Sequence, residues 1–214
     1  TPYRFAQSLA SAGLQSRLLL LDELCDCIGR DIFYAGELDF LYQAREELAA
    51  SVTMEGIRRL SRLTGDMYYE ILSRTTPPEL GFRRRAARPY NDPVNAMFSL
   101  GYAMLYGNCC VSTIGAHLNP DRGMLHEGAG SLVYDLIEPQ KAMMVDRIVI
   151  RFAREEISEN DYECSEKRCY LDTNLSNQLV QALRDSIDQT RIDTQVQILR
   201  DALLTNAEFH VLYW

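Results

Sequence analysis

Apolar residues recur along most of this chain at intervals of three or four positions, the spacing of an amphipathic helix. Two such runs cover residues 3–28 and 37–50. A third begins after Ser51 and Thr53, either of which can act as its N-cap. The apolar stripe of this third run is Ile57, Leu60, Leu63, Met67, Tyr68 and Ile71. Alternating strand patterns are almost absent, so the pattern predicts an all-α, mainly helical fold.

The middle of the chain contains a strong helix start at Asp92-Pro93, because Asp is a favoured N-cap and Pro fits the first helical position. The helix that follows is apolar on nearly all sides and should be buried. We expect it to end near Tyr106, before Gly107-Asn108. Further predicted elements are helices over 110–118 and 131–137, a strand at 169–171, a helix over 176–204 that breaks near Thr190, and a docked apolar end at 209–214.

Length and composition describe an ordinary globular chain. The 214 residues can bury a sizeable core, and no run of 18 apolar residues predicts a membrane span. Residues 1–20 lack the basic start and apolar block of a secretory signal. Six cysteines in a chain of this size favour a reduced, cytoplasmic protein over a disulfide framework. Cys164 and Cys169 have the spacing nearest to a metal clip.

The net charge of −8 argues at first against a nucleic-acid partner. However, residues 53–151 carry 12 basic and 10 acidic residues, a net charge of +2, and the excess acid lies in the two flanks. Of 22 basic residues only Lys141 and Lys167 are lysines, and arginine is the better bidentate partner for phosphate. The loop over 75–88 contains a cluster of four arginines, namely Arg83, Arg84, Arg85 and Arg88.

Four residues could carry chemistry beside this loop, and each also has an ordinary structural interpretation. Glu55 opens a helix, where an acid is favoured by the helix dipole or pairs with Arg59. His126 lies in a glycine-flanked loop, where a histidine is most often a structural hydrogen-bonding group. Asp135 and Glu138 are three apart on one helical face, among apolar residues, so at least one should be partly buried and need a metal, a cation or a proton.

Taken together, these carboxylates and one imidazole are hard ligands that suit Mg²⁺ or Mn²⁺ rather than structural zinc. A hard-metal site beside an arginine-rich loop is what phosphodiester chemistry needs, because the metal polarises a phosphoryl oxygen and stabilises the leaving oxygen. The spacing of these residues has low specificity by itself.

Four segments of the chain carry a family pattern: EELAASVTMEGIRRLSRLTGDMYYEIL, ARPYNDPVNAMFSLGYAMLY, GAHLNPDRGMLHE and SLVYDLIEPQKAMMVDRIV. In this order they resemble the CRISPR-associated integrase family, the universal spacer-acquisition subunit. The resemblance covers residues 42–151. The chain departs from the family pattern after Glu138, where Pro139-Gln140-Lys141 replaces Glu-Phe-Arg-Pro. It also shows no counterpart of the family's N-terminal β domain, which suggests either a shortened or a compact form.

The resemblance implies a catalytic helical domain over 41–214, preceded by a helical segment over 1–40. It implies metal ligands Glu55, His126 and Glu138, with Asp135 as an accessory acid. The expected reaction is attack by the 3′-hydroxyl of a short DNA duplex on a phosphodiester of a CRISPR array, with Mg²⁺ or Mn²⁺ as cofactor. The residues expected to clamp the DNA backbone are Arg83, Arg84, Arg85 and Arg88, with Arg58, Arg59 and Arg62 as weaker candidates.

The expected partners are double-stranded DNA and further copies of the chain, since insertion at two strands needs two active sites. The absence of the β domain leaves docking of the family's small ferredoxin-like subunit open. Two alternatives also stay open at this point: a helical DNA-binding scaffold without chemistry, and a nuclease or transposon-borne integrase of the same fold.

Overall fold

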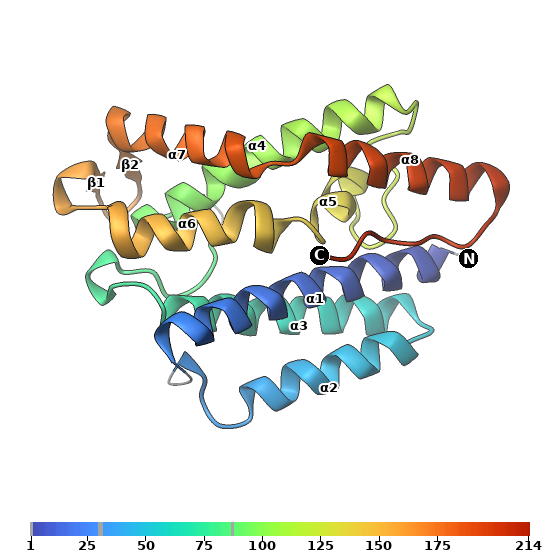
Figure 1. Cartoon of the computed structure of the whole chain (residues 1–214), viewed down its shortest axis with the longest axis horizontal. Coiled ribbons are helices and arrows are strands. Elements are labelled where there is room, and N and C mark those ends of the chain that lie inside the picture. Colours follow the sequence, from blue (N-terminus) through green and yellow to red (C-terminus); the bar gives the residue numbers. More distant parts are fainter. Residues whose placement is uncertain (1, 30–31, 87) are drawn as a thin grey trace.

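The computed structural model describes residues 2–29, 32–86 and 88–214 and confirms a mainly helical fold (Figure 1). The α-helices are α1 (Pro2–Ile28), α2 (Glu37–Ala50), α3 (Met54–Ser73), α4 (Pro93–Gly115), α5 (Ser131–Ile137), α6 (Arg147–Arg151), α7 (Thr173–Ser186) and α8 (Gln189–Thr205). Two π-helical segments flank α6, namely η3 (Ala142–Asp146) and η4 (Phe152–Glu156). Two short 3₁₀ turns are η2 (Pro78–Leu80) and η5 (Glu159–Asp161).

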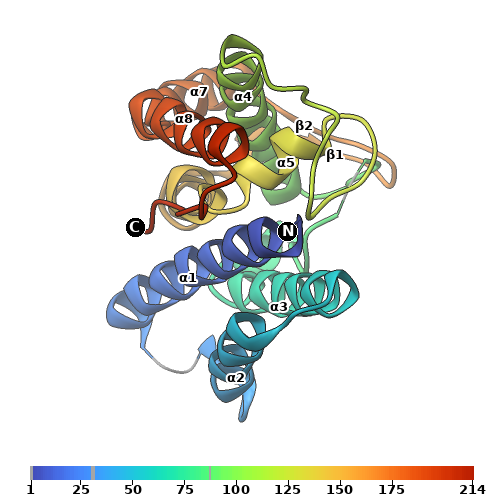
Figure 2. The same ribbon diagram turned by 90° about the vertical axis from the view of Figure 1, so that its right-hand side faces the viewer.

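The helices form two layers. Helices α1, α2 and α3 pack on one another, and α4 packs against α5, α6, α7 and α8 (Figures 1 and 2). The two layers meet where α1 contacts η3 and α5. None of the described helices is both long and apolar enough to cross a membrane.

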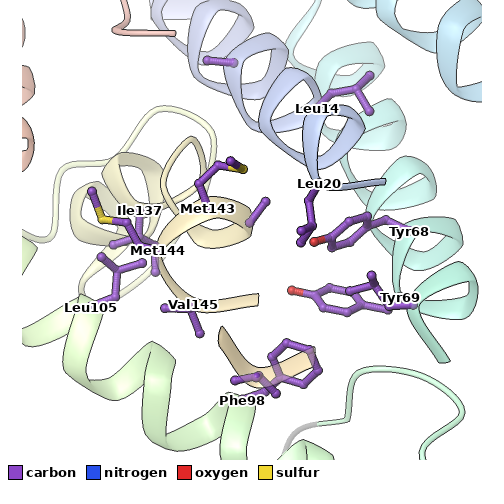
Figure 3. Close-up of a cluster of buried hydrophobic side chains, with 14 of the residues drawn as sticks. Leu14, Leu20, Tyr68, Tyr69, Phe98, Leu105, Ile137, Met143, Met144 and Val145 are labelled. Atoms are coloured by element: carbon purple, nitrogen blue, oxygen red, sulfur yellow. The ribbon is translucent and has the colours of Figure 1, made fainter. Parts of the chain in front are cut away.

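The contact between the layers is a core of side chains from α1, α3, α4 and the segment around η3 (Figure 3). One close approach depends on glycine: a Cβ added to Gly101 of α4 would lie 2.5 Å from Cγ1 of Val145 in η3. The missing side chain lets η3 pack directly on the α4 backbone and brings the neighbouring Tyr102 close to η3.

The predicted starts of α3 and α4 are confirmed. Thr53 caps α3 by accepting a hydrogen bond from the Gly56 amide, and Asp92 caps α4 through the Asn95 amide. The predicted end of the central helix near Tyr106 is wrong, since α4 continues to Gly115 and includes the separate helix expected over 110–118. Tertiary packing against α8 buries Cys109 and Thr113 and outweighs the weak local stop signal.

Three smaller predictions can be compared directly. Leu63, expected in the buried stripe of α3, is 40% exposed. The break in the last helical region falls at Ile187–Asp188, just before the expected position, where Asp188 caps α8. The docked C-terminal end is confirmed, because Phe209 is buried and the Trp214 indole donates to the Pro139 carbonyl at 2.9 Å.

Strands β1 (Tyr162–Cys164) and β2 (Cys169–Leu171) form an antiparallel hairpin. The short strand predicted at 169–171 is therefore confirmed. In the hairpin register Cys164 lies opposite Cys169, and the two form a disulfide. This corrects the expectation of wholly reduced cysteines, because pairing across the strands brings the two thiols together. It also rules out the minor alternative that these two cysteines form a metal clip.

Candidate active site

Asp135 organises the loop that carries the candidate histidine. It is fully buried on α5, and its two oxygens accept hydrogen bonds from the backbone amides of Met124, Leu125 and His126 at 2.5, 3.0 and 2.8 Å. Its Oδ1 also lies 2.8 Å from Nδ1 of His126. The predicted accessory acid is thus buried in a position where it shapes the loop and orients the imidazole.

This contact decides which nitrogen of His126 faces the site. A carboxylate only accepts hydrogen bonds, so Nδ1 is the donor, and Nε2 of the neutral ring keeps its lone pair. Nε2 lies 3.6 Å from Oε1 of Glu138, and the imidazole is partly exposed. An imidazole oriented by a carboxylate through its other nitrogen is a common arrangement for a metal-binding histidine.

Glu138 follows α5 and is almost completely buried. Its Oε2 accepts a hydrogen bond from Nη2 of Arg17 at 2.7 Å, and its Oε1 accepts one from Nζ of Lys141 at 2.5 Å. Burial alone would raise the pKa of Glu138, but Lys141 and Arg17 outweigh burial and lower that pKa to about 2. Glu138 is therefore a buried carboxylate that is held ionised at neutral pH.

These groups open onto a hollow of about 500 Å³ between α1, α3 and the loop of His126. Among the charged side chains of its walls, the cations Arg17, Arg58, Arg62, Arg85 and Lys141 outnumber the carboxylates Asp66, Glu127 and Glu138. Arg58 also braces the loop, because it donates to the carbonyls of Leu125 and Met124 and pairs with Glu127. A polyanion such as a DNA strand matches this lining.

Glu55 lies apart from this cluster. It is exposed on the first turn of α3, three residues before Arg58, so the two share one helical face next to the hollow. Arg59, its expected partner, pairs instead with Glu47 of α2 at 3.1 Å. The role of Glu55 as a metal ligand stays a prediction.

The fit of a divalent metal can be judged from the donors. Across residues 2–29, 32–86 and 88–214, no three His, Cys, Asp or Glu side chains converge closely enough to hold a metal. His126 and Glu138 nevertheless offer one nitrogen and one hard oxygen 3.6 Å apart, and a lysine ammonium already places a cation on that oxygen. The pair fits Mg²⁺ or Mn²⁺, with further ligands to come from Glu55, water or substrate.

The predicted arginine clamp divides into two parts. Arg83 and Arg84 are exposed on the loop before α4, as a DNA contact requires. Arg85 is held by the side chains of Asn95 and Ser99 at 2.9 and 3.0 Å and lines the hollow. Its ring contact with Tyr102, at 5.4 Å, adds to this fixation. Of the remaining candidates, Arg88 lies over the ring of Tyr90, and Arg62 lines the hollow.

Two site residues were missed from the sequence. Arg17 is a charged residue on the otherwise apolar stripe of α1, between Leu14 and Leu21, and this placement is a signal of a buried charge. Lys141 gave no such signal. It lies in the segment that departs from the family pattern, and its Nζ donates to Oε1 of Glu138.

Comparison with known proteins identifies the family of the chain. Residues 4–185 match the family model described as CRISPR associated protein Cas1. A CRISPR-associated endonuclease Cas1 of Methanospirillum hungatei is 39% identical over 99% of the chain and 70% of its own length. A second, from Thermus thermophilus, is 32% identical over 81% of the chain and 62% of its own length.

Solved structures show the same fold. A casposase bound to integration product superposes with a TM-score of 0.85 at 21% identity, over 98% of this chain and 62% of that one. The Cas6-RT-Cas1–Cas2 complex gives a TM-score of 0.85 at 20% identity, over 99% of this chain and 25% of that one. At these identities the likeness establishes the fold alone, whereas the family match covers most of the sequence. The chain belongs to the Cas1 family of CRISPR-associated proteins.

Proposed function

We propose that this chain carries the catalytic part of a metal-dependent DNA integrase, which inserts short DNA duplexes into a CRISPR array by 3′-hydroxyl attack on a phosphodiester. The observation that carries the proposal is the pairing of Nε2 of His126 with the buried, ionised Glu138 at 3.6 Å, inside a hollow whose walls carry more cations than carboxylates. Such a lining suits the phosphates on both sides of a scissile bond.

His126 and Glu138 would hold the metal, with Glu55 as the third protein ligand. When bound, Mg²⁺ or Mn²⁺ supplies charge stabilisation at the phosphoryl oxygens and at the leaving oxygen. Asp135 keeps the imidazole in the ligating orientation through Nδ1. Arg17 binds Oε2 of Glu138, so Oε1, which Lys141 also binds, is the oxygen directed at His126.

The arginines bind the DNA. Arg83 and Arg84 approach phosphates from the exposed loop, and Arg85 and Arg62 line the hollow. Contacts of this kind position a duplex without reading its sequence. We further propose that two or more copies act together, and that a Cas2-type subunit is a partner, because one structural neighbour is a complex of Cas6-RT-Cas1 with Cas2.

The test is strand transfer of an end-labelled DNA duplex into a repeat-bearing plasmid. Joined product with Mn²⁺ or Mg²⁺, and none in EDTA, is the expected result. Full transfer in EDTA would contradict metal dependence. If the plasmid is cleaved but no duplex is joined to it at any duplex concentration, the protein is a nuclease that uses the same residues and not an integrase.

A further inference from the structure

A second buried carboxylate lies behind the candidate active site. Asp146, at the end of η3, is fully buried. Its Oδ2 accepts a hydrogen bond from the hydroxyl of Tyr68 at 2.8 Å, and its Oδ1 accepts one from Tyr102 at 2.5 Å. The hydroxyl of Tyr69 bonds in turn to that of Tyr102. In Figure 3 the hydroxyls of Tyr68 and Tyr69 point from α3 toward the segment that carries Met143–Val145.

Each ring bound to Asp146 carries one of the cations of the site. The guanidinium of Arg17 lies 5.7 Å from the ring centre of Tyr68, and Nζ of Lys141 lies 5.6 Å from that of Tyr102. Both separations fall within the range of a cation–π interaction. The same two cations bind the two oxygens of Glu138.

We infer that Asp146 is a positioning residue of the site, which fixes the two tyrosine rings that carry the cations holding Glu138. Two parallel chains of contacts join the two carboxylates. Asp146 binds the hydroxyls of Tyr68 and Tyr102. The ring of Tyr68 supports Arg17 and that of Tyr102 supports Lys141, and each of these cations binds one oxygen of Glu138. The kinetic part of this inference rests on the proposed function, whereas its structural part does not.

The π-helical turn of η3 makes this arrangement possible. A π-helix closes its hydrogen bonds between residues five apart, so Lys141 and Asp146 lie one turn apart on the same side. In a regular α-helix, residues five apart would differ by about 140° around the axis. The wide turn therefore lets one segment present a cation to Glu138 and an anion to the tyrosines.

The charges also balance across the cluster. Ionised Glu138 and Asp146 face the two cations Arg17 and Lys141. Burial raises the pKa of Asp146 to about 6, against the effect of its tyrosine hydrogen bonds. The carboxylate is therefore mostly ionised at neutral pH, where its charge offsets one of the two cations.

The first test uses the fact that the chain contains two lysines, Lys141 and Lys167. In protein labelled with ¹⁵N-lysine, the NMR spectrum of the ammonium groups therefore contains a signal from Lys141 and one from Lys167, which is exposed and serves as an internal control. We expect Asp146→Asn, which keeps the shape of the side chain, to shift the Lys141 signal and to speed its proton exchange at least tenfold at fixed pH. The Lys167 signal should not move. An unchanged Lys141 signal would overturn the inference.

The second test removes the hydroxyls and keeps the rings. Tyr68→Phe and Tyr102→Phe should each shift the Lys141 signal. The double variant should give the same signal as Asp146→Asn, because all three residues act through one network. Tyr162→Phe, on β1, is the matched control. If Asp146→Asn fails to fold, the Lys141 signal in Tyr102→Phe decides the question in the same way.

The third measurement is strand transfer with Asp146→Asn. We expect kcat to fall by about 10–100-fold, as for other residues that orient metal ligands, with KM for DNA unchanged. A fall in kcat with an undisturbed Lys141 signal would contradict the positioning route. If the unaltered protein showed no strand transfer, the proposed function would fail, and the Lys141 signal would still decide whether Asp146 positions the cations.

Discussion

Lys141 binds the oxygen of Glu138 that faces the candidate histidine: its Nζ lies 2.5 Å from Oε1, and Nε2 of His126 lies 3.6 Å from the same oxygen. A lysine ammonium and a metal ion bound between the imidazole and the carboxylate would therefore compete for one oxygen. Lys141 also keeps the buried carboxylate neutralised when no metal is bound.

Replacing Lys141 should strengthen metal binding. We expect Lys141→Met to bind Mn²⁺ roughly tenfold more tightly, equivalent to about 1.4 kcal/mol, because a competing cation is removed. Calorimetric titration with Mn²⁺ measures this, and Lys167→Met is the matched control because Lys167 is the chain's other lysine and is exposed. Equal or weaker binding in Lys141→Met would show that the ammonium does not occupy the metal-binding oxygen.

Glu138 should make the free energy of unfolding depend on pH in the acidic range. Its pKa in the folded protein, about 2, lies below its usual value of 4.5. Its contribution is therefore fully present above pH 4.5 and is lost as the pH falls toward 2, by an amount on the order of 3 kcal/mol. Urea unfolding at a series of pH values should show this loss in the natural protein and not in Glu138→Gln. If the free energy of unfolding changes with pH in the same way in both proteins, Glu138 does not have the lowered pKa assigned to it.

The two acids at the end of α5 should differ in their roles. Glu138→Ala should abolish strand transfer, because it removes a metal ligand. Asp135→Ala should leave measurable transfer, reduced about 10–100-fold, because Asp135 orients His126. It should also lower the free energy of unfolding by about 1–3 kcal/mol, since three backbone amides lose their acceptor. A variant Asp135→Ala that is inactive, beside an active Glu138→Ala, would reverse the assignment.

Glu55 offers a test in which stability and activity separate. Because its side chain is exposed, Glu55→Gln should change the free energy of unfolding by less than about 0.5 kcal/mol. If it is the third metal ligand, the same variant should abolish strand transfer and weaken Mn²⁺ binding. Normal transfer by Glu55→Gln would remove it from the metal site.

The exposed arginines should determine the salt dependence of DNA binding. Changing Arg83 and Arg84 to Ala should weaken duplex binding and reduce the slope of log K against log salt by roughly 1–2, at unchanged stability. Arg85→Ala should also lower stability, because Arg85 bonds Asn95 and Ser99. Arg184→Ala, an exposed arginine of α7, is the control. If this slope does not change in the double variant, Arg83 and Arg84 do not contact DNA phosphates.

The sequence by itself determined the helical class, the cap of α4 and the identity of the family. These features depend on local periodicity, on capping residues such as Asp92, and on short segments that can be compared directly. It also singled out His126, Asp135 and Glu138: each has an ordinary structural interpretation by itself, and the family resemblance pointed to them as site residues.

Only the tertiary structure decided how those residues are held. The ion pair of Arg17 with Glu138 joins positions 121 residues apart, and Tyr68 meets Asp146 across 78 residues. Such contacts arise where two helical layers pack, so no local pattern predicts them. The continuation of α4 beyond Asn108 and the wide turn of η3 have the same origin: packing on neighbouring helices outweighs local preference at those positions.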